Sequence, residues 1–206
     1  MLLDLKLMSK IDGINEAIEL AVRQLENADM KARAHLLGLD MADDANIKMR
    51  VFGKDMLLDT ACFSLKNAAD GKDAKPADRL LALHYLRCEL PVKPAGELIS
   101  FRDFTGGQFY YQPFLSRTVV PLVGRFGNDL EQLKKNLDRF DWSPRNFGDF
   151  SAEIHALGAL GITLIYRLGD DEFPAEAEVL FDASVKRVFE AEDAAVLAGR
   201  ICIGLL

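Results

Sequence analysis

Two short segments near the carboxyl end alternate their side chains with a period of two residues. In ITLIYRL, residues 162–168, Ile162, Leu164, Tyr166 and Leu168 share one side, and Thr163, Ile165 and Arg167 share the other. In EAEVLFD, residues 176–182, Ala177, Val179 and Phe181 face one way, and Glu176, Glu178 and Asp182 face the other with Leu180. A period of two is typical of strands with one buried side, so we expect two half-exposed strands. Their closeness in sequence favours antiparallel pairing.

The amino-terminal part of the chain combines helix and hairpin patterns. Residues 14–37 repeat apolar side chains at helical spacing, with Asp12 or Asn15 as a cap and Gly38 as a stop. The segment IKMRVFGKDMLLDTACFSL predicts two short strands around Phe52-Gly53-Lys54-Asp55. Residues 66–76 have no apolar period and predict a mobile surface loop.

The rest of the chain alternates helices with one aromatic segment. Pro76 suits the first turn of a helix, ADRLLALHYLRCEL, that Pro91 and Pro94 stop. We expect GELISFRDFTGGQFYYQPF to form a strand and a loop. Residues 114–139 look helical, with a break near Gly127 and a cap at Asn128 or Asp129. The sequence therefore predicts one α+β domain over residues 1–206, with an amino-terminal helical arm at 1–38, an antiparallel sheet and a buried carboxy-terminal helix.

Charge and cysteine content limit the partners and the compartment. With a net charge of −7 and a pI near 5.0, the chain lacks the basic patch that nucleic acid or an anionic membrane would need. Its three cysteines, Cys62, Cys88 and Cys202, lie far apart and predict free thiols in a reducing compartment. The start MLLDLKLMSK does not resemble a signal peptide, and we find no run of roughly 18–20 apolar residues, so we expect a cytoplasmic protein.

An acidic stretch joins the two alternating segments. Its carboxylates are Asp170, Asp171, Glu172, Glu176, Glu178 and Asp182. Gly169 and the three acidic residues after it suit a tight turn, although such a group can also hold a hard cation. Asp182 stands where a helix should begin, so capping is favoured over catalysis. The turn interpretation is the stronger one.

Three further residue groups suggest chemistry more weakly. Ser151, Glu153 and His155 share one side of a strand, where neighbours do not easily form a hydrolase relay. His84 and Cys88 stand four apart on an expected helix, with Cys62 as a third soft ligand, but they also suit an apolar helix face, and we predict no metal site.

The aromatic segment supplies the last group. It places aromatic side chains around Gly106-Gly107, with Arg102 and Arg117 nearby. As a pocket wall, Arg102, Gly106, Gly107, Tyr110 and Tyr111 would meet an anionic ligand. Core packing around a turn is the favoured interpretation.

Three blocks resemble a known family in the same order. LLALHYLRCELP, GELISFRDFTGGQFYYQPF and LGDDEFPAEAEVLFDASVKRVFEAED are similar to the recurring blocks of domain-of-unknown-function family 3786, over roughly residues 36–206. The positions that resemble the family's signature are Gly169, Asp170, Glu172, Phe173, Pro174, Leu180, Phe181 and Asp182. The resemblance implies anaerobic bacteria and archaea as the setting, and it supplies no catalytic residues. Some members resemble fusions to a four-cysteine iron–sulphur module, which this chain lacks.

Two functions follow from these patterns, and neither names a cofactor. The first is a non-catalytic accessory protein of anaerobic redox or one-carbon metabolism that binds a protein partner or a small anionic ligand. The alternative is a metal-assisted hydrolase or lyase that uses the acidic residues of 170–182, with His155 as a further candidate. A structural subunit of a complex and self-association into a homo-oligomer also remain open. The patterns lean against an enzyme.

Overall fold

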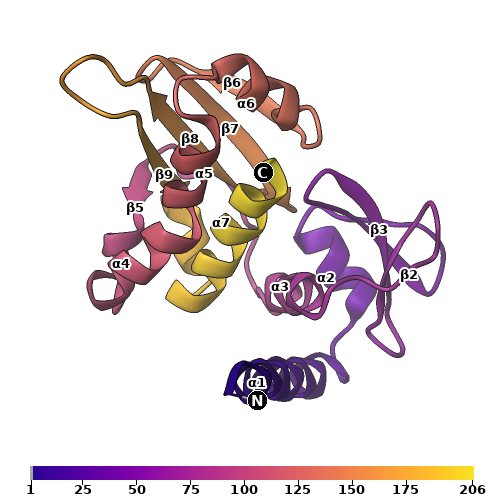
Figure 1. Ribbon diagram of the computed structural model, residues 1–206. Coiled ribbons are helices and arrows are strands. Elements are labelled where there is room, and N and C mark those ends of the chain that lie inside the picture. The colour runs from indigo at the N-terminus through magenta and orange to yellow at the C-terminus, as the bar shows by residue number, and fades with distance from the viewer. Residues whose placement is uncertain (1) are drawn as a thin grey trace. The chain divides into compact units, whose positions relative to one another are not determined.

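The computed structural model describes residues 2–206, with side chains from Asp12 onward. The chain divides into two compact units, Met1–Val92 and Lys93–Leu206. Each unit contains helices and an antiparallel group of strands, which Figure 1 shows in chain order from indigo to yellow. The predicted α+β class and antiparallel pairing are therefore confirmed.

Two helices replace the single helix expected at residues 14–37. Helix α1 spans Leu2–Leu25 and α2 spans Met30–Leu36, so the predicted caps Asp12 and Asn15 lie inside α1. The second helix begins where the Asp29 carboxylate accepts a hydrogen bond from the Ala32 N–H at 2.9 Å. A good N-cap satisfies backbone donors at a helix start, and here it makes a new start favourable. The predicted stop is confirmed, since Gly38 follows α2 with φ 70°.

The strands of the first unit are built around the predicted hairpin. Strand β2 (Asn46–Val51) pairs with β3 (Lys54–Asp59), and β1 (Asp40–Met41) and β4 (Leu65–Asn67) extend the group on either side. Phe52 and Gly53 both have positive φ, at 47° and 75°, which is the two-residue turn that suits a hairpin.

The second half of the expected hairpin differs from the prediction. The chain leaves β3 at Asp59, whose carboxylate accepts hydrogen bonds from the N–H groups of Ala61 and Cys62, both at 2.8 Å. Because this local turn takes the backbone groups, TACFSL cannot continue the strand. The expected loop at 66–76 starts inside β4 and leads to α3 (Pro76–Leu86), and its mobility stays a prediction.

The strands of the second unit follow the order β6-β7-β8-β9-β5, and every pair in it is antiparallel. They span Trp142–Arg145 (β6), Phe150–Leu157 (β7), Leu160–Arg167 (β8), Glu176–Asp182 (β9) and Leu98–Ser100 (β5). The pairing of the two alternating segments is confirmed, with Leu164 opposite Val179.

Strand β8 is more buried than its sequence predicts. On the side expected to face solvent, Thr163 and Ile165 are only 2% and 4% exposed. Strands flank β8 on both sides, and the turn at Gly148 packs on it. A side chain at Gly148 would lie 2.9 Å from the Tyr166 carbonyl oxygen and 3.1 Å from Ile165 Cγ2. The alternating pattern therefore identified the strand correctly but did not show that its second side is covered.

The aromatic segment is mainly helical, which corrects the expected strand and loop. After β5 it forms a 3-10 turn, η1 (Phe101–Asp103), and then helix α4 (Gly107–Arg117). A capping box of Ser100 and Asp103 starts the turn. Glycine and proline disfavour helix when read alone, but packing of an aromatic side of α4 on the sheet overrides this tendency.

Four more helical elements complete the second unit. They are α5 (Val119–Phe126), α6 (Leu130–Leu137), η2 (Ala183–Arg187) and α7 (Ala191–Leu205). The expected break at Gly127 is confirmed, with Asp129 capping α6 through the Gln132 N–H at 3.0 Å. A second break at Thr118, between α4 and α5, was not predicted.

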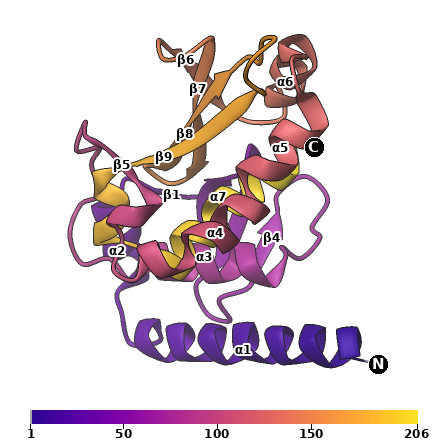
Figure 2. The same ribbon diagram turned by 60° about the vertical axis from the view of Figure 1, so that its left-hand side comes forward.

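The helices cover one side of the sheet. Figures 1 and 2 show α4, α5 and α7 as a layer against β7, β8 and β9. This side carries the apolar positions of the alternating pattern, and Leu164, Val179 and Phe181 are buried there. The predicted burial of the carboxy-terminal helix is also confirmed, since Leu197, Ile201 and Leu205 are fully buried.

A buried asparagine ties α6 to the end of α7. The Asn136 side-chain amide donates a hydrogen bond to the Leu205 carbonyl oxygen at 2.7 Å and accepts one from Gln132 at 2.8 Å. Arg139 donates to the neighbouring Gly204 carbonyl oxygen at 3.1 Å. These contacts supply donors to carbonyl groups in the last turn of α7, which have no N–H partner within the helix.

We expect Asn136→Ala to lower the free energy of unfolding by about 1–3 kcal/mol, because it leaves the buried Leu205 carbonyl group without its donor. Urea unfolding followed by circular dichroism measures this change. The control Gln112→Ala removes an exposed amide from α4 and should stay within about 0.5 kcal/mol of wild type. Equal stability of Asn136→Ala and wild type would contradict a stabilising role for the hydrogen bond from Asn136 to Leu205.

Candidate functional site

Most aromatic side chains of the segment 101–114 belong to the core. The Phe101 and Phe114 rings stack with centroids 4.2 Å apart, and Phe104 meets Phe181 edge to face at 5.3 Å. Such pairs add stability beyond their buried area. The core interpretation is thus confirmed for these rings, and they fasten η1 and α4 to β9.

Two aromatic side chains of α4 point into solvent instead. Phe109 is 89% exposed and Tyr110 is 65% exposed. Pro113 and Arg117 are also exposed, and they follow Phe109 at steps of four residues, so these side chains adjoin on the helix surface. We call Phe109, Tyr110, Pro113 and Arg117 the α4 face.

Arg102 and Tyr111 lie at the flank of this helix. The Arg102 guanidinium carbon is 4.0 Å from the centre of the Tyr111 ring, the geometry of a cation–π contact. Stacking uses the flat side of the guanidinium group and leaves its in-plane N–H donors available for a carboxylate. Of the predicted site residues, the structure brings Arg102 and Tyr111 together and leaves Tyr110 on the exposed side.

The two glycines shape the backbone at the start of α4. Gly106 has φ 77°, a conformation that L side chains rarely adopt. A side chain at Gly107 would lie 2.0 Å from the Phe101 carbonyl oxygen. Close packing of α4 on η1 therefore explains Gly107 without a ligand.

The acidic stretch begins with a turn built by Asp170. Its carboxylate accepts hydrogen bonds from the N–H groups of Glu172 at 2.9 Å and Phe173 at 2.8 Å, which lower the pKa of the carboxyl group. The Asp170 N–H donates to the Phe173 carbonyl oxygen at 2.9 Å. The turn interpretation is thus confirmed for Asp170.

A second contact holds the turn against the helix layer. The Asn128 side-chain amide pairs with the Gly169 peptide group through hydrogen bonds of 3.0 Å and 2.8 Å. Gly169 has no room for a side chain, since one would lie 2.6 Å from the Ala175 nitrogen. Asp171, Glu172 and Phe173 remain exposed beyond this anchored base, with Phe173 at 66%.

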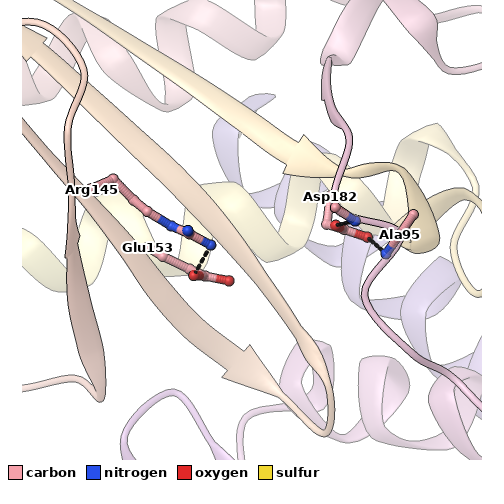
Figure 3. Close-up of polar contacts among 5 residues, drawn as sticks. Ala95, Arg145, Glu153 and Asp182 are labelled. Carbon is pink, nitrogen blue, oxygen red and sulfur yellow. Dashed lines mark hydrogen bonds and ion pairs between the residues drawn. The ribbon is translucent and has the colours of Figure 1, made fainter.

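Asp182 caps the following helical turn and also binds a segment far away in the sequence, which local patterns did not reveal. Its carboxylate accepts hydrogen bonds from the Ser184 N–H at 2.9 Å and from the N–H groups of Ala95 and Gly96, both at 2.8 Å. Figure 3 shows Asp182 beside Ala95. The cap is confirmed. The contacts to Ala95 and Gly96 depend on the pairing of β5 with β9, for which no local pattern gives a signal.

The Ser151, Glu153 and His155 trio forms no relay. Glu153 pairs with Arg145 of β6 at 2.5 Å, as Figure 3 shows, and the Ser151 hydroxyl oxygen accepts the Phe147 N–H at 2.9 Å. His155 contacts the Gly158 carbonyl oxygen through Nε2. Each side chain thus has its own partner. No sequence pattern signals the pairing of Arg145 with Glu153, because the register of β6 against β7 brings these two side chains together.

The His84 and Cys88 pair does not have the expected geometry. Helix α3 ends at Leu86, so Cys88 lies beyond it and the predicted spacing on one helix is wrong. Arg33 donates to the Cys88 carbonyl oxygen at 2.6 Å, a tertiary contact that holds this segment outside the helix. Burial raises the pKa of the Cys88 thiol, while the charges of Arg33 and Arg87 lower it by less. Cys62 is exposed on its loop. Within the described part of the chain, no three His, Cys, Asp or Glu side chains gather as a metal site would require.

The fold and these contacts define an α+β protein with an exposed aromatic helix and an acidic turn. The chain belongs to the family described as Domain of unknown function (DUF3786), whose model matches residues 29–203. The resemblance found in the sequence is therefore confirmed. No curated protein and no solved structure matches this chain. In residues 2–206, no helix combines the length and the apolar character needed to cross a bilayer.

We expect Gly107→Ala and Gly124→Ala to change stability in opposite directions. The first places Cβ against the Phe101 carbonyl oxygen at 2.0 Å, so it should lower the free energy of unfolding by about 1–3 kcal/mol. The second meets nothing within 4 Å inside α5 and should raise it by up to about 1 kcal/mol. Urea unfolding of both variants measures the difference, and the same sign for both would contradict it.

Asp182→Asn should reduce stability at neutral pH and lose this effect on acidification. Burial raises the pKa of the Asp182 carboxyl group, but the hydrogen bonds from the N–H groups of Ala95, Ser184 and Gly96 more than offset it, so the pKa lies below 3.8. The ionised carboxylate therefore stabilises the folded state above pH 3.8, and this stabilisation disappears as the pH falls through the lowered pKa.

Urea unfolding at pH 7 and near pH 3 tests this expectation. The difference between wild type and Asp182→Asn should be larger at pH 7. The control Asp171→Asn changes an exposed carboxylate and should stay within about 0.5 kcal/mol of wild type. A constant difference at both pH values for Asp182→Asn would exclude the carboxylate as its cause.

Proposed function

We propose that this protein is a non-catalytic binding protein that docks a partner protein on the α4 face. The observation that carries the proposal is the exposure of Phe109 and Tyr110, at 89% and 65%, on adjacent positions of one helix. Adjoining exposed aromatic side chains are unfavourable in water and are enriched where proteins meet. Pro113 extends the apolar surface toward Arg117.

The charges around the α4 face select the chemistry of the partner. Arg117 belongs to it, and Arg102 lies beside Tyr111 on another side of the same helix. Both are exposed arginines on a chain whose net charge is −7. A partner segment with carboxylates beside an aromatic side chain would match both the apolar surface and these charges.

The alternative of a metal-assisted hydrolase receives less support from the acidic residues. Catalysis by a bound cation needs carboxylate oxygens that are available to it. The carboxylate of Asp170 accepts two N–H groups and that of Asp182 accepts three. Asp171 and Glu172 are exposed, but among the described residues no three His, Cys, Asp or Glu side chains gather to hold a cation, so we do not propose this reaction.

The setting of the protein is part of the same proposal. The exposed free thiol of Cys62 and the buried free thiol of Cys202 support a reducing compartment, and we place the protein in the cytoplasm. The family resemblance suggests a partner from anaerobic redox or one-carbon metabolism. A small anionic ligand at Arg102 fits the same donors but leaves Phe109 unexplained.

Peptide binding tests the proposal directly. We expect labelled peptides with two or three carboxylates beside a phenylalanine to bind wild type, as fluorescence anisotropy would show. Phe109→Ala and Arg117→Ala should each weaken binding by ~10-fold or more, as loss of an interface anchor does. Lys135→Ala, which changes an exposed cation on α6, is the matched control.

Two results would contradict the proposal. One is that no such peptide binds wild type. The other is that peptides bind, but with the same affinity for Phe109→Ala and Arg117→Ala. Peptides with lysine in place of each carboxylate should bind weakly, and equal binding would remove the role given to the arginines.

A further inference from the structure

A second exposed surface of the same unit has the complementary composition. The loop between β8 and β9 presents Asp170, Asp171 and Glu172 beside Phe173, which is 66% exposed, and Pro174 is exposed next to it. We call residues 170–174 the acidic tip. It combines carboxylates with an aromatic side chain, which is the chemistry that the α4 face would accept.

We infer that the partner on the α4 face is the acidic tip of a second copy of this chain. This inference rests on the proposed function and names its partner. Arg117 lies in the α4 face, and three carboxylates lie at the acidic tip, so the charges of the two surfaces attract each other. Phe109, Tyr110 and Phe173 supply the apolar part of the contact.

The acidic tip does not cover the α4 face of its own chain. Both surfaces are exposed, since Phe109 and Phe173 are 89% and 66% accessible. Helix α5 explains the separation. At its carboxyl end, the Gly127 carbonyl oxygen accepts a hydrogen bond from the Tyr166 hydroxyl at 2.8 Å, and the next residue, Asn128, pairs with the Gly169 peptide group. This end of α5 therefore lies near the acidic tip. Its other end joins α4 at Thr118, about 12 Å away for eight residues of helix.

This separation suits a two-fold arrangement of copies. Figure 1 shows the β8–β9 loop beyond one end of β9 and α4 near the other end. When two such units lie side by side in opposite directions, each acidic tip reaches the α4 face of the other. A two-fold axis makes both contacts at once and closes the assembly at a dimer.

The acidic tip is also held in shape before it meets a partner. Asp170 fixes the turn through the N–H groups of Glu172 and Phe173, and Asn128 fixes its base at Gly169. A preformed loop loses less conformational entropy on association than a flexible one. Each buried aromatic side chain contributes about 150–250 Å², so two contacts of three aromatics supply much of the ~1,200 Å² of a small specific interface.

Sedimentation velocity of the full chain tests the inference. We expect wild type to change from monomer to dimer between roughly 1 µM and 1 mM, and the dimer to weaken in high salt because salt screens exposed charges. Phe109→Ser should raise the dimer dissociation constant by ~10-fold or more. A monomer across the whole range would overturn the inference.

Charge reversal gives the sharper test. Arg117→Glu alone and Asp171→Lys with Glu172→Lys should each raise the dissociation constant by ~10-fold or more, because like charges then meet. The triple variant reverses both surfaces and should restore the dimer. Lys135→Glu makes the same charge change as Arg117→Glu on exposed α6 and should leave the dimer unchanged. The inference would also be overturned if these charge reversals left the dissociation constant unchanged, or if the triple variant did not restore the dimer.

Failure of this inference and failure of the proposed function give different results. If the chain stays monomeric but acidic aromatic peptides bind the α4 face, another protein supplies the partner segment. If the chain stays monomeric and no peptide binds, the proposed function fails as well. A peptide of residues 168–176 should compete with dimer formation when the inference holds.

Discussion

The antiparallel pairing of β8 with β9 is the constraint on which the second unit depends. Its register places Leu164 opposite Val179 and Ile162 opposite Phe181, so that one side of the sheet is continuously apolar. Slipping the register by one residue would turn that apolar row toward the other side. The turn at Asp170 and the contact between Asn128 and Gly169 stabilise the connection between the two strands, which explains the glycine and aspartate in this signature stretch.

Phe181 links this pairing to the helix layer. It contacts the Phe104 ring at 5.3 Å and the Phe114 ring at 6.2 Å. With Phe101 and Phe114 stacked, one side of α4 is used for packing, and the opposite side must face away from the sheet. The exposure of Phe109 and Tyr110 is therefore a consequence of the core contacts that orient the helix. A helix with aromatic side chains on both sides can satisfy the core with one of them and a partner with the other.

The acidic residues divide between backbone support and surface in a similar way. Asp170 and Asp182 accept N–H groups from neighbouring or distant backbone, and these bonds account for the lowered pKa of both carboxyl groups. The side chains of Asp171 and Glu172 are exposed instead and give the loop its charge. One short stretch thus contains both the residues that hold a turn and the residues that the turn presents, a division that composition does not show.

The sequence by itself determined the strands β8 and β9, the hairpin at Phe52 and Gly53, the break at Gly127, the cap at Asp182, and the buried α7. In each case neighbouring residues carry the cause: a two-residue period, a turn that needs positive φ, an oxygen that accepts nearby N–H groups, or an apolar helix. Tertiary structure alone decided that GQFYYQPF is helical, that Thr163 is buried and that Asp182 holds Ala95 and Gly96. It also decided that Phe109 faces solvent while Phe114 faces the core. These outcomes depend on residues far apart in the chain, and the free energy of packing them exceeds the local preferences that a sequence pattern reports.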